Sequence, residues 1–319
     1  ANTWLATQLD TIGNIQASFE LRKQTFERDP LHAATFGNLQ QAYTVLGQTE
    51  EALIMLDGLQ AYLPDDGQLL GDYGQVYLMS GHLAKAQEYF QSSHEKEPLN
   101  DVNRIWYGFN LLSSQNYELA ARIAPDRLAT LALSRLGRTE EALIMGKKVI
   151  DSGQVPNWYF QALAENERFA ELVEVLESRW HSLDDFSRDW PGRRGYGYHS
   201  MGYIAQAYRA LGNESKFSDA MSRLRTALDS QLDEGADNWP LRISQAHYAM
   251  LVDDHEAAIG FLEMAFKRGA YLDTNNETAF LIFKPLNGNP RFEAAKAAMN
   301  ARLDEELKKI GDEDSSELL

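Results

Sequence analysis

The chain has 319 residues, no cysteine, and 47 acidic against 30 basic residues, which gives a formal net charge of −17. This acidity disfavours a surface for nucleic acids or anionic membranes, because both need clustered lysines and arginines. The absence of cysteine excludes disulfides and thiolate chemistry, and no apolar run reaches the roughly 18 residues that a membrane span needs.

Residues 2–28 predict one or two lead-in helices that end at Pro30. The next stretch, 33–66, predicts two short antiparallel helices that turn at Gly47. Apolar residues recur at helical spacing on both: Phe36, Leu39 and Tyr43 on the first, and Ala52, Leu56 and Leu59 on the second. Pro64 ends the second helix.

This pattern repeats after 34 residues. The offset is shared by Tyr43 and Tyr77, Gly47 and Gly81, Ala52 and Ala86, and Pro64 and Pro98. A further copy lies 90 residues on, since 46–55 and 136–145 differ only at Gln48 and Arg138. Because 90 is not a multiple of 34, we expect one shortened unit between the two copies.

These positions resemble the tetratricopeptide repeat (TPR). The second unit, 67–100, matches its pattern best, at Leu70, Tyr73, Gly74, Tyr77, Gly81, Ala86, Phe90 and Pro98. The resemblance implies an all-α, right-handed superhelical solenoid of TPR-like helix pairs. Neither helix of a pair can bury its apolar face alone, so neighbouring pairs must stack.

Later units are looser. Residues 101–114 predict the first helix of a third unit, but 115–125 is too short for a normal partner helix. Further pairs are expected to turn at Gly137, Asn166, Gly212 and Asp253-Asp254. An amphipathic helix at 291–310, with Phe292, Ala295, Met299 and Leu303 on one side, is predicted to cap the last pair.

The predicted divisions are 1–30 lead-in helices, 31–180 N-terminal sub-array, 181–199 inter-array loop, 200–270 C-terminal sub-array, 271–310 cap and 311–319 acidic, disordered tail. The closing segment with Pro290-Arg291-Phe292 is similar to that of the repeat regions of bacterial class III adenylate cyclases and winged-helix regulators.

No pattern for catalysis or metal binding is present. No two of the seven histidines lie three to five residues apart, as a helical metal pair requires. Paired carboxylates such as Asp65-Asp66 stand at predicted turns, where aspartate caps helices, and an open superhelix rarely supplies the dry pocket that catalytic carboxylates need. We therefore predict that the chain is not an enzyme and uses no cofactor or metal.

The inter-array loop is one candidate binding site. It concentrates arginines and aromatic residues: Arg188, Trp190, Arg193, Arg194, Tyr196 and Tyr198. Arginine beside an aromatic face suits a carboxylate or an acidic peptide. Alternatively, these arginines pair with local acids such as Asp184, Asp185 and Asp189, and the aromatic rings fill the seam between the sub-arrays. Residues 101–200, with 12 basic and 14 acidic side chains, are the least acidic part of the chain.

The concave groove is the other candidate site. The TPR resemblance implies that the first helix of each pair lines this groove, chiefly through its second, fifth, ninth and twelfth positions. The candidate residues are Gln41, Thr44, Gln75, Ile105, Phe109, Leu112, Gln206, Arg209 and Arg242. The glutamines suit the backbone of an extended segment, and the apolar residues suit its side-chain anchors. Alternatively, Phe109 and Leu112 are covered by other parts of the chain. The cationic clamp of TPR domains that bind chaperone tails is missing, because Gly37, Gln41 and Asp72 stand at clamp positions.

These features predict a protein-interaction scaffold or adaptor that binds a peptide segment or partner domain in the concave groove. The alternative is a sensory or regulatory TPR region of a bacterial signalling protein that binds a small ligand. We expect a cytoplasmic or, alternatively, a periplasmic protein, with no nucleic-acid partner and no direct membrane insertion. The sequence leaves the oligomeric state open.

Overall fold

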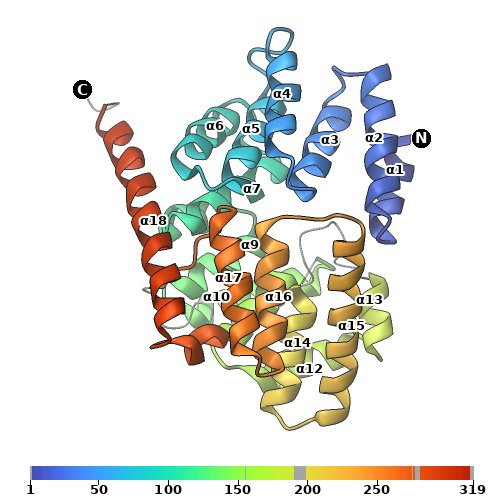
Figure 1. Ribbon diagram of the computed structural model, residues 1–319, viewed down its shortest axis with the longest axis vertical. Coiled ribbons are helices and arrows are strands. Elements are labelled where there is room, and N and C mark those ends of the chain that lie inside the picture. The colour runs from blue at the N-terminus through green and yellow to red at the C-terminus, as the bar shows by residue number, and fades with distance from the viewer. Residues whose placement is uncertain (1, 155, 190–198, 275, 277–280, 317–319) are drawn as a thin grey trace.

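The computed structural model describes residues 2–154, 156–189, 199–274, 276 and 281–316, and all regular elements in these ranges are helices (Figure 1). They are α1 (Asn2–Thr11), α2 (Ile15–Arg28), α3 (Ala33–Val45), α4 (Thr49–Gln60), α5 (Gly67–Met79), α6 (Leu83–Lys96), α7 (Asp101–Ser113), α8 (Tyr117–Ile123), α9 (Asp126–Arg135), α10 (Thr139–Asp151), α11 (Asn157–Glu165), α12 (Phe169–Arg179), α13 (Leu183–Asp189), α14 (His199–Ala210), α15 (Glu214–Asp233), α16 (Trp239–Leu251), α17 (His255–Lys267), the 3-10 helix η1 (Leu281–Leu286) and α18 (Pro290–Ser316). None of these helices has both the length and the hydrophobicity to cross a membrane.

Consecutive helices pack as pairs, from α1 with α2 to α16 with α17. Ala52, Ala86 and Ala142, which occupy equivalent positions on the second helix of their pairs, are all fully buried. A small residue at such a position lets two helices approach closely. The predicted all-α helical repeat fold is therefore confirmed.

The shortened unit lies between α7 and α9. Gln115, 34 residues after Gly81, takes the left-handed conformation of the turn glycines, with φ of 60° against 81°. The helix that follows it, α8, has only seven residues, and α9 begins at Asp126. This truncated second helix accounts for the spacing of 90 residues between the two copies of the turn sequence.

The pairs form two layers (Figure 1). Helices α2 to α7 make up the upper layer, and α12 to α17 lie below it. The carbonyl oxygen of Val45 accepts hydrogen bonds from Asp237 N at 3.0 Å and Asn238 Nδ2 at 2.9 Å, and Gln16 Nε2 donates to Glu234 O at 2.7 Å. The chain therefore winds round until its C-terminal pairs pack beneath its N-terminal pairs.

Helix α18 covers the last pair and joins both layers. Its Phe292, Met299 and Leu303 are buried, and the helix packs against α17 and α6. Glu306 Oε2 accepts a hydrogen bond from Ala84 N at 2.9 Å. The helix runs beyond the predicted end at 310, through Ser316, into the segment predicted as a disordered tail.

The predicted inter-array loop 181–199 differs from expectation, because it contains the helix α13. Phe186 explains this helix: it is fully buried, and its ring centroid lies 5.1 Å from that of Trp180 and 6.1 Å from that of Phe160. The predicted boundary does not interrupt the core either, since Leu176 and Met201 belong to one buried apolar cluster. Residues 190–198 lie outside the described ranges.

Candidate functional site

The first helices of the pairs form a continuous inner face. Contacts run from α3 to α5, α5 to α7, α7 to α9, α9 to α11, α11 to α14 and α14 to α16. This is the face on which the sequence places the concave groove. Helices α3, α5 and α7 form its upper part, and α9, α14 and α16 form its lower part (Figure 1). Helix α11 contacts both α9 and α14.

The upper part is rich in amides that are engaged within the fold. Gln40 Nε2 donates to Thr44 Oγ1 at 2.8 Å, and the Thr44 hydroxyl donates to Gln40 O at 2.8 Å. Of the predicted groove residues here, Thr44 and Gln75 are buried, and Gln41 is partly exposed. Gln41 is therefore the predicted amide that a ligand can reach directly.

Asp72 is a buried acid within this part of the face. Its side chain is 3% exposed, Gln68 Nε2 donates to Oδ1 at 2.8 Å, and Oδ2 is without a hydrogen-bond partner among the described residues. Burial raises the pKa of Asp72 to about 8, the hydrogen bond from Gln68 acts against this rise, and the charge of Asp66 adds to it. Asp72 is therefore mostly a neutral acid at pH 7.

We expect Asp72→Asn to remove part of the pH dependence of stability. Between the ordinary pKa of 3.8 and the folded value of about 8, the unfolded chain ionises Asp72 while the folded chain keeps the proton. Stability is therefore lost as pH rises through this window, by up to about 1.4 kcal/mol per pH unit. Urea unfolding from pH 4 to 9 should show a flatter profile for Asp72→Asn and a more stable variant at pH 8. Parallel profiles for the two proteins would refute this assignment.

An aromatic cluster lies where α7, α9 and α11 adjoin. The Phe109 ring centroid is 5.8 Å from that of Trp106 and 5.6 Å from that of Trp158, which it meets edge to face. The Arg127 guanidinium lies 5.8 Å from the Trp158 ring centroid. Arg127 makes no ion pair with any described residue, and its buried Nε finds no acceptor among them. The cluster therefore combines apolar rings with a positive charge that no described carboxylate neutralises.

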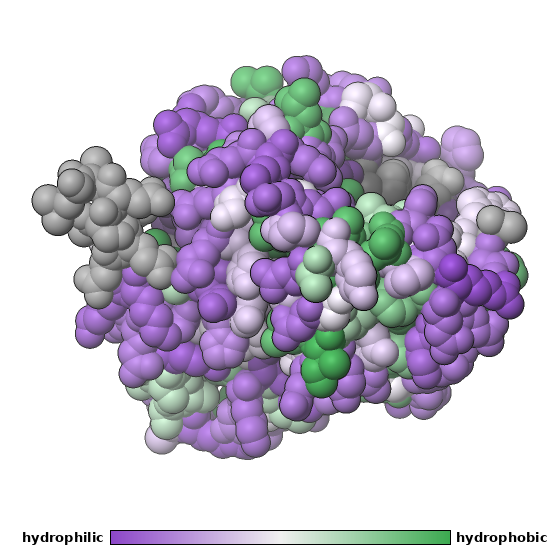
Figure 2. Space-filling model, turned by 90° about the horizontal axis from the view of Figure 1, so that it is seen from above, coloured by the Kyte–Doolittle hydropathy of each residue, from purple (hydrophilic) through white to green (hydrophobic). Residues whose placement is uncertain are grey.

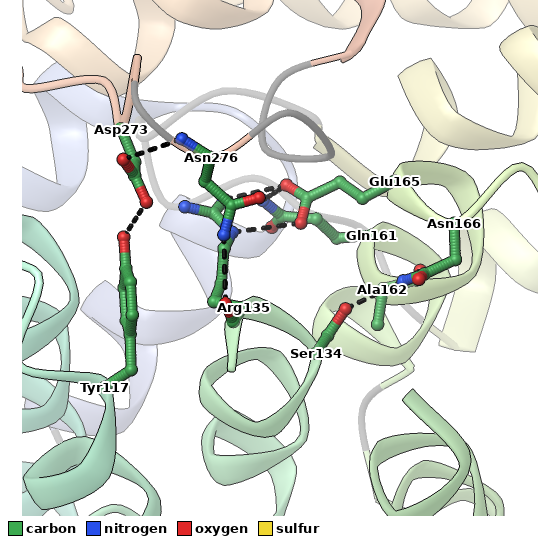
Figure 3. A network of polar contacts seen from close by, with 9 residues as sticks. All are labelled: Tyr117, Ser134, Arg135, Gln161, Ala162, Glu165, Asn166, Asp273 and Asn276. Carbon is green, nitrogen blue, oxygen red and sulfur yellow. Dashed lines mark hydrogen bonds and ion pairs between the residues drawn. The ribbon is translucent and has the colours of Figure 1, made fainter. Parts of the chain in front are cut away.

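At the C-terminal ends of α9 and α11, the lower part of the inner face is covered by described residues of the chain's own segment between α17 and α18 (Figure 3). The Tyr117 hydroxyl donates to Asp273 Oδ2, and Asn276 Nδ2 donates to Arg135 O at 3.0 Å. Farther along, η1 lies against residues of α11, α14 and α16. This part of the predicted groove is therefore self-occupied in its described residues.

A buried ion pair stands under this segment (Figure 3). Arg135 Nε and Nη2 donate to the two carboxylate oxygens of Glu165 at 3.1 and 2.7 Å, and the side chains are 5% and 3% exposed. Gln161 Nε2 also donates to Glu165, at 2.9 Å. Burial by itself would lower the pKa of Arg135, but the Glu165 carboxylate outweighs it and raises that pKa. Arg135 therefore remains charged, and its hydrogen bonds to Glu165 join α9 to α11.

Little space remains beside this pair. A hollow of about 20 Å³ is lined by Glu165, Tyr203, Gln206, His247 and η1. That volume accommodates about one water molecule. The predicted groove residue Gln206 therefore faces a nearly filled interior.

The predicted arginines that the structure describes, Arg188, Arg209 and Arg242, are engaged within the fold. Arg209 Nη2 pairs with Asp253 at 2.8 Å, and Arg242 Nη2 pairs with Asp237 at 2.7 Å. Arg188 pairs with Asp185, as in the local alternative for the loop. The other loop candidates, Trp190, Arg193, Arg194, Tyr196 and Tyr198, lie outside the described residues. The inner-face candidates Ile105 and Phe109 are partly buried, and Leu112 is buried.

Sequence reasoning missed Arg127 and Trp158. Both are the second residue of a first helix, in α9 and α11, where the repeat pattern places groove residues. The shortened unit precedes both helices and interrupts the 34-residue period. Counting by 34 from the earlier units therefore does not reach these two positions. Counting positions from the first residue of each first helix would have identified both residues.

Comparison with known proteins shows a fold similarity only. No protein-family model and no curated protein matches the chain. Among solved structures, Cut9 in the APC/C hetero-tetramer Cut9–Hcn1 is 12% identical over 89% of this chain, with a TM-score of 0.43, and the chain spans 52% of its length. A TPR protein from Parabacteroides merdae is 15% identical over 89% of this chain and 96% of its own, with a TM-score of 0.36. Human IFIT1, in a dimer with m7Gppp-AAAA, is 14% identical over 98% and 76% of the two chains, with a TM-score of 0.44.

Proposed function

We propose that the chain is a protein-interaction scaffold whose inner face binds a segment of a partner protein at the aromatic cluster. The carrying observation is that Arg127, a cation without a described counter-ion, lies beside the ring of Trp158, which in turn contacts the ring of Phe109. Aromatic and arginine side chains are the residue types that dominate protein-binding energy. An apolar partner side chain packs on Phe109 and Ile105, and a partner carboxylate pairs with Arg127.

The position of the cluster in the chain supports an acidic partner segment. Residues 101–200 carry 12 basic and 14 acidic side chains, whereas the whole chain carries 30 and 47. An anionic segment is repelled least in this region. At the covered part of the inner face, the alternative of a sensory region that binds a small ligand is disfavoured, because the hollow beside Tyr203 and His247 has a volume of only about 20 Å³.

The test is affinity capture from lysate of the source cell, with cross-linking and mass spectrometry to locate the contact. We expect one partner to be retained by the wild type and lost with Arg127→Ala and with Phe109→Ala, because each removes one half of the anchor. Arg122→Ala, which changes an exposed arginine on the adjacent helix α8, is the matched control and should retain the partner. Circular dichroism checks that all variants keep the wild-type helicity.

If all these variants retained the same proteins, the aromatic cluster would not be the binding site. If no protein were captured by any version, the scaffold itself would fail, and the small-ligand alternative would take its place.

A further inference from the structure

An open apolar groove lies on a second face, between α2 and α4 with α3 as its floor. Its volume is about 810 Å³, and its apolar lining includes Phe26, Leu31, Ile54, Met55 and Tyr62. Leu31, Ile54 and Tyr62 are exposed, and Ile54 is 66% exposed. Figure 2 looks down onto this end of the molecule and shows hydrophobic side chains exposed to the right of its centre. We refer to this surface as the α2–α4 groove.

The groove has the dimensions of a helix site. Its lining on α4 and beyond runs from Glu51 to Tyr62, which corresponds to about 16 Å, or three turns, at the helical rise. The walls are two helices that flank a third, with contacts from α2 to α3 and from α3 to α4. Such a channel accepts the apolar face of an amphipathic helix, whose side chains at i, i+3 or i+4, and i+7 fill it.

The charged residues around the groove favour a partner of positive charge. Glu27 and Glu51 line it, both are exposed, and neither forms an ion pair with a described residue. The lining cation Lys23 is 3.5 Å from Glu20, which offsets its charge. Residues 15–66, which form the groove and its surroundings, contain eight acidic and three basic side chains. A partner that buries leucine-like residues here is therefore favoured when lysine or arginine flanks them.

We propose that the α2–α4 groove is a docking site for a basic amphipathic helix of a partner protein. Its apolar residues pack against Phe26, Ile54 and Met55, and its lysines or arginines face Glu27 and Glu51. This groove and the aromatic cluster of the inner face are formed by different helices, so the two proposals can be refuted independently.

The repeat itself supplies a matched control. Ile54 and Ile144 stand at the same place in the two nearly identical segments 46–55 and 136–145, and both are exposed, at 66% and 71%. Only Ile54 lines the α2–α4 groove. Ile54→Glu and Ile144→Glu therefore introduce the same substitution in the same local sequence, but only Ile54→Glu alters the α2–α4 groove.

The probe is a fluorescein-labelled peptide of about 15 residues, built from leucine and lysine so that the leucines form one helical face. Fluorescence anisotropy at about 0.15 M salt measures its binding to the full chain. We expect Ile54→Glu to weaken binding roughly tenfold or more, as for a central anchor, and Ile144→Glu to leave it unchanged. The double variant Glu27→Lys, Glu51→Lys should weaken the leucine-lysine peptide and strengthen a leucine-glutamate peptide of the same pattern.

Equal effects of Ile54→Glu and Ile144→Glu would overturn the proposal, because binding would then reflect the overall negative charge of the chain. Absence of binding to the wild type, or equal binding of both peptides, would also overturn it. Sedimentation of the chain alone tests another occupant: a wild-type dimer that Ile54→Glu dissociates would make the groove a self-interface and overturn the proposal of a basic helix. Loss of a lysate partner with Arg127→Ala but not with Ile54→Glu would assign that partner to the inner face alone.

Discussion

Replacing Glu165 by alanine is expected to lower the free energy of unfolding by about 3–5 kcal/mol. The change removes both hydrogen bonds from Arg135 to Glu165, at 3.1 and 2.7 Å, and takes the Glu165 carboxylate away from a guanidinium that is only 5% exposed. Arginine cannot relieve this cost by losing its proton. Urea unfolding at pH 7, followed by circular dichroism, measures the change.

Glu141→Ala is the matched control for this prediction. Glu141 also forms two hydrogen bonds to one arginine, Arg138, at 2.9 and 2.7 Å, but these side chains are 59% and 44% exposed. Solvent replaces such a pair, so the expected loss of stability is far smaller than that of Glu165→Ala. A third variant, Arg135→Met with Glu165→Met, should recover most of the stability, since it removes both charges. Similar losses in Glu165→Ala and Glu141→Ala would show that burial does not set the energy of the inner pair.

The repeat pairs could be predicted where glycine fixes the turn. Gly47, Gly81, Gly137 and Gly212 all adopt φ between 69° and 81°, which glycine reaches without strain. In the looser pairs the same turns contain Gln115, Glu167 and Asp253, with φ from 56° to 60°. The turn at Asp253 was predicted, and the turn at Glu167 was predicted one residue early, at Asn166. Gln115 gave no turn signal, because the surrounding helix packing rather than its residue type stabilises that turn.

The layers of the fold could not be predicted in this way. Gln16 contacts Glu234, and Ala84 contacts Glu306, across more than 200 residues of sequence. The 34-residue period describes how neighbouring pairs stack, but it does not specify how far the chain winds before distant pairs meet. The coverage of the lower inner face by Asp273, Asn276 and η1 follows from the same long-range packing.

The candidate sites show a similar division. Phe109 and Ile105 were predicted because the repeat pattern marks first-helix positions that face inward, and both lie at or near the aromatic cluster. The α2–α4 groove was not predicted, because it forms between the lead-in helices and the first repeat. The sequence period identifies equivalent positions in successive repeat units. The α2–α4 groove instead forms where the first unit packs against a helix that precedes the repeats, so the period does not reveal it.

Because the two layers approach closely at Gly81, we expect Gly81→Ala to lower the free energy of unfolding by about 3 kcal/mol or more. Gly137→Ala is expected to lower it by about 1–2 kcal/mol. Both glycines end the first helix of a pair in the left-handed region, with φ of 81° and 73°, so alanine meets the same backbone strain at each. A Cβ at Gly81 would lie 2.6 Å from the Cα of Gly269 in the other layer, whereas a Cβ at Gly137 would have no atom within 4 Å. Backbone cannot rotate away as a side chain can, so alanine at Gly81 must separate the layers and lengthen the hydrogen bond of 2.7 Å from the Tyr271 hydroxyl to Gly81 O.

Urea unfolding gives the difference between these two variants, and hydrogen exchange locates it. Faster exchange in Gly81→Ala should concentrate at the ends of α5 and α17, because these ends meet between the layers, while Gly137→Ala should leave both unchanged. Gly47→Ala provides an independent repeat of the test, since its Cβ would lie 2.4 Å from the carbonyl oxygen of Asp237. If Gly81→Ala and Gly137→Ala lose the same stability, the turn conformation alone determines the cost, and the two layers are held together by the other contacts between them.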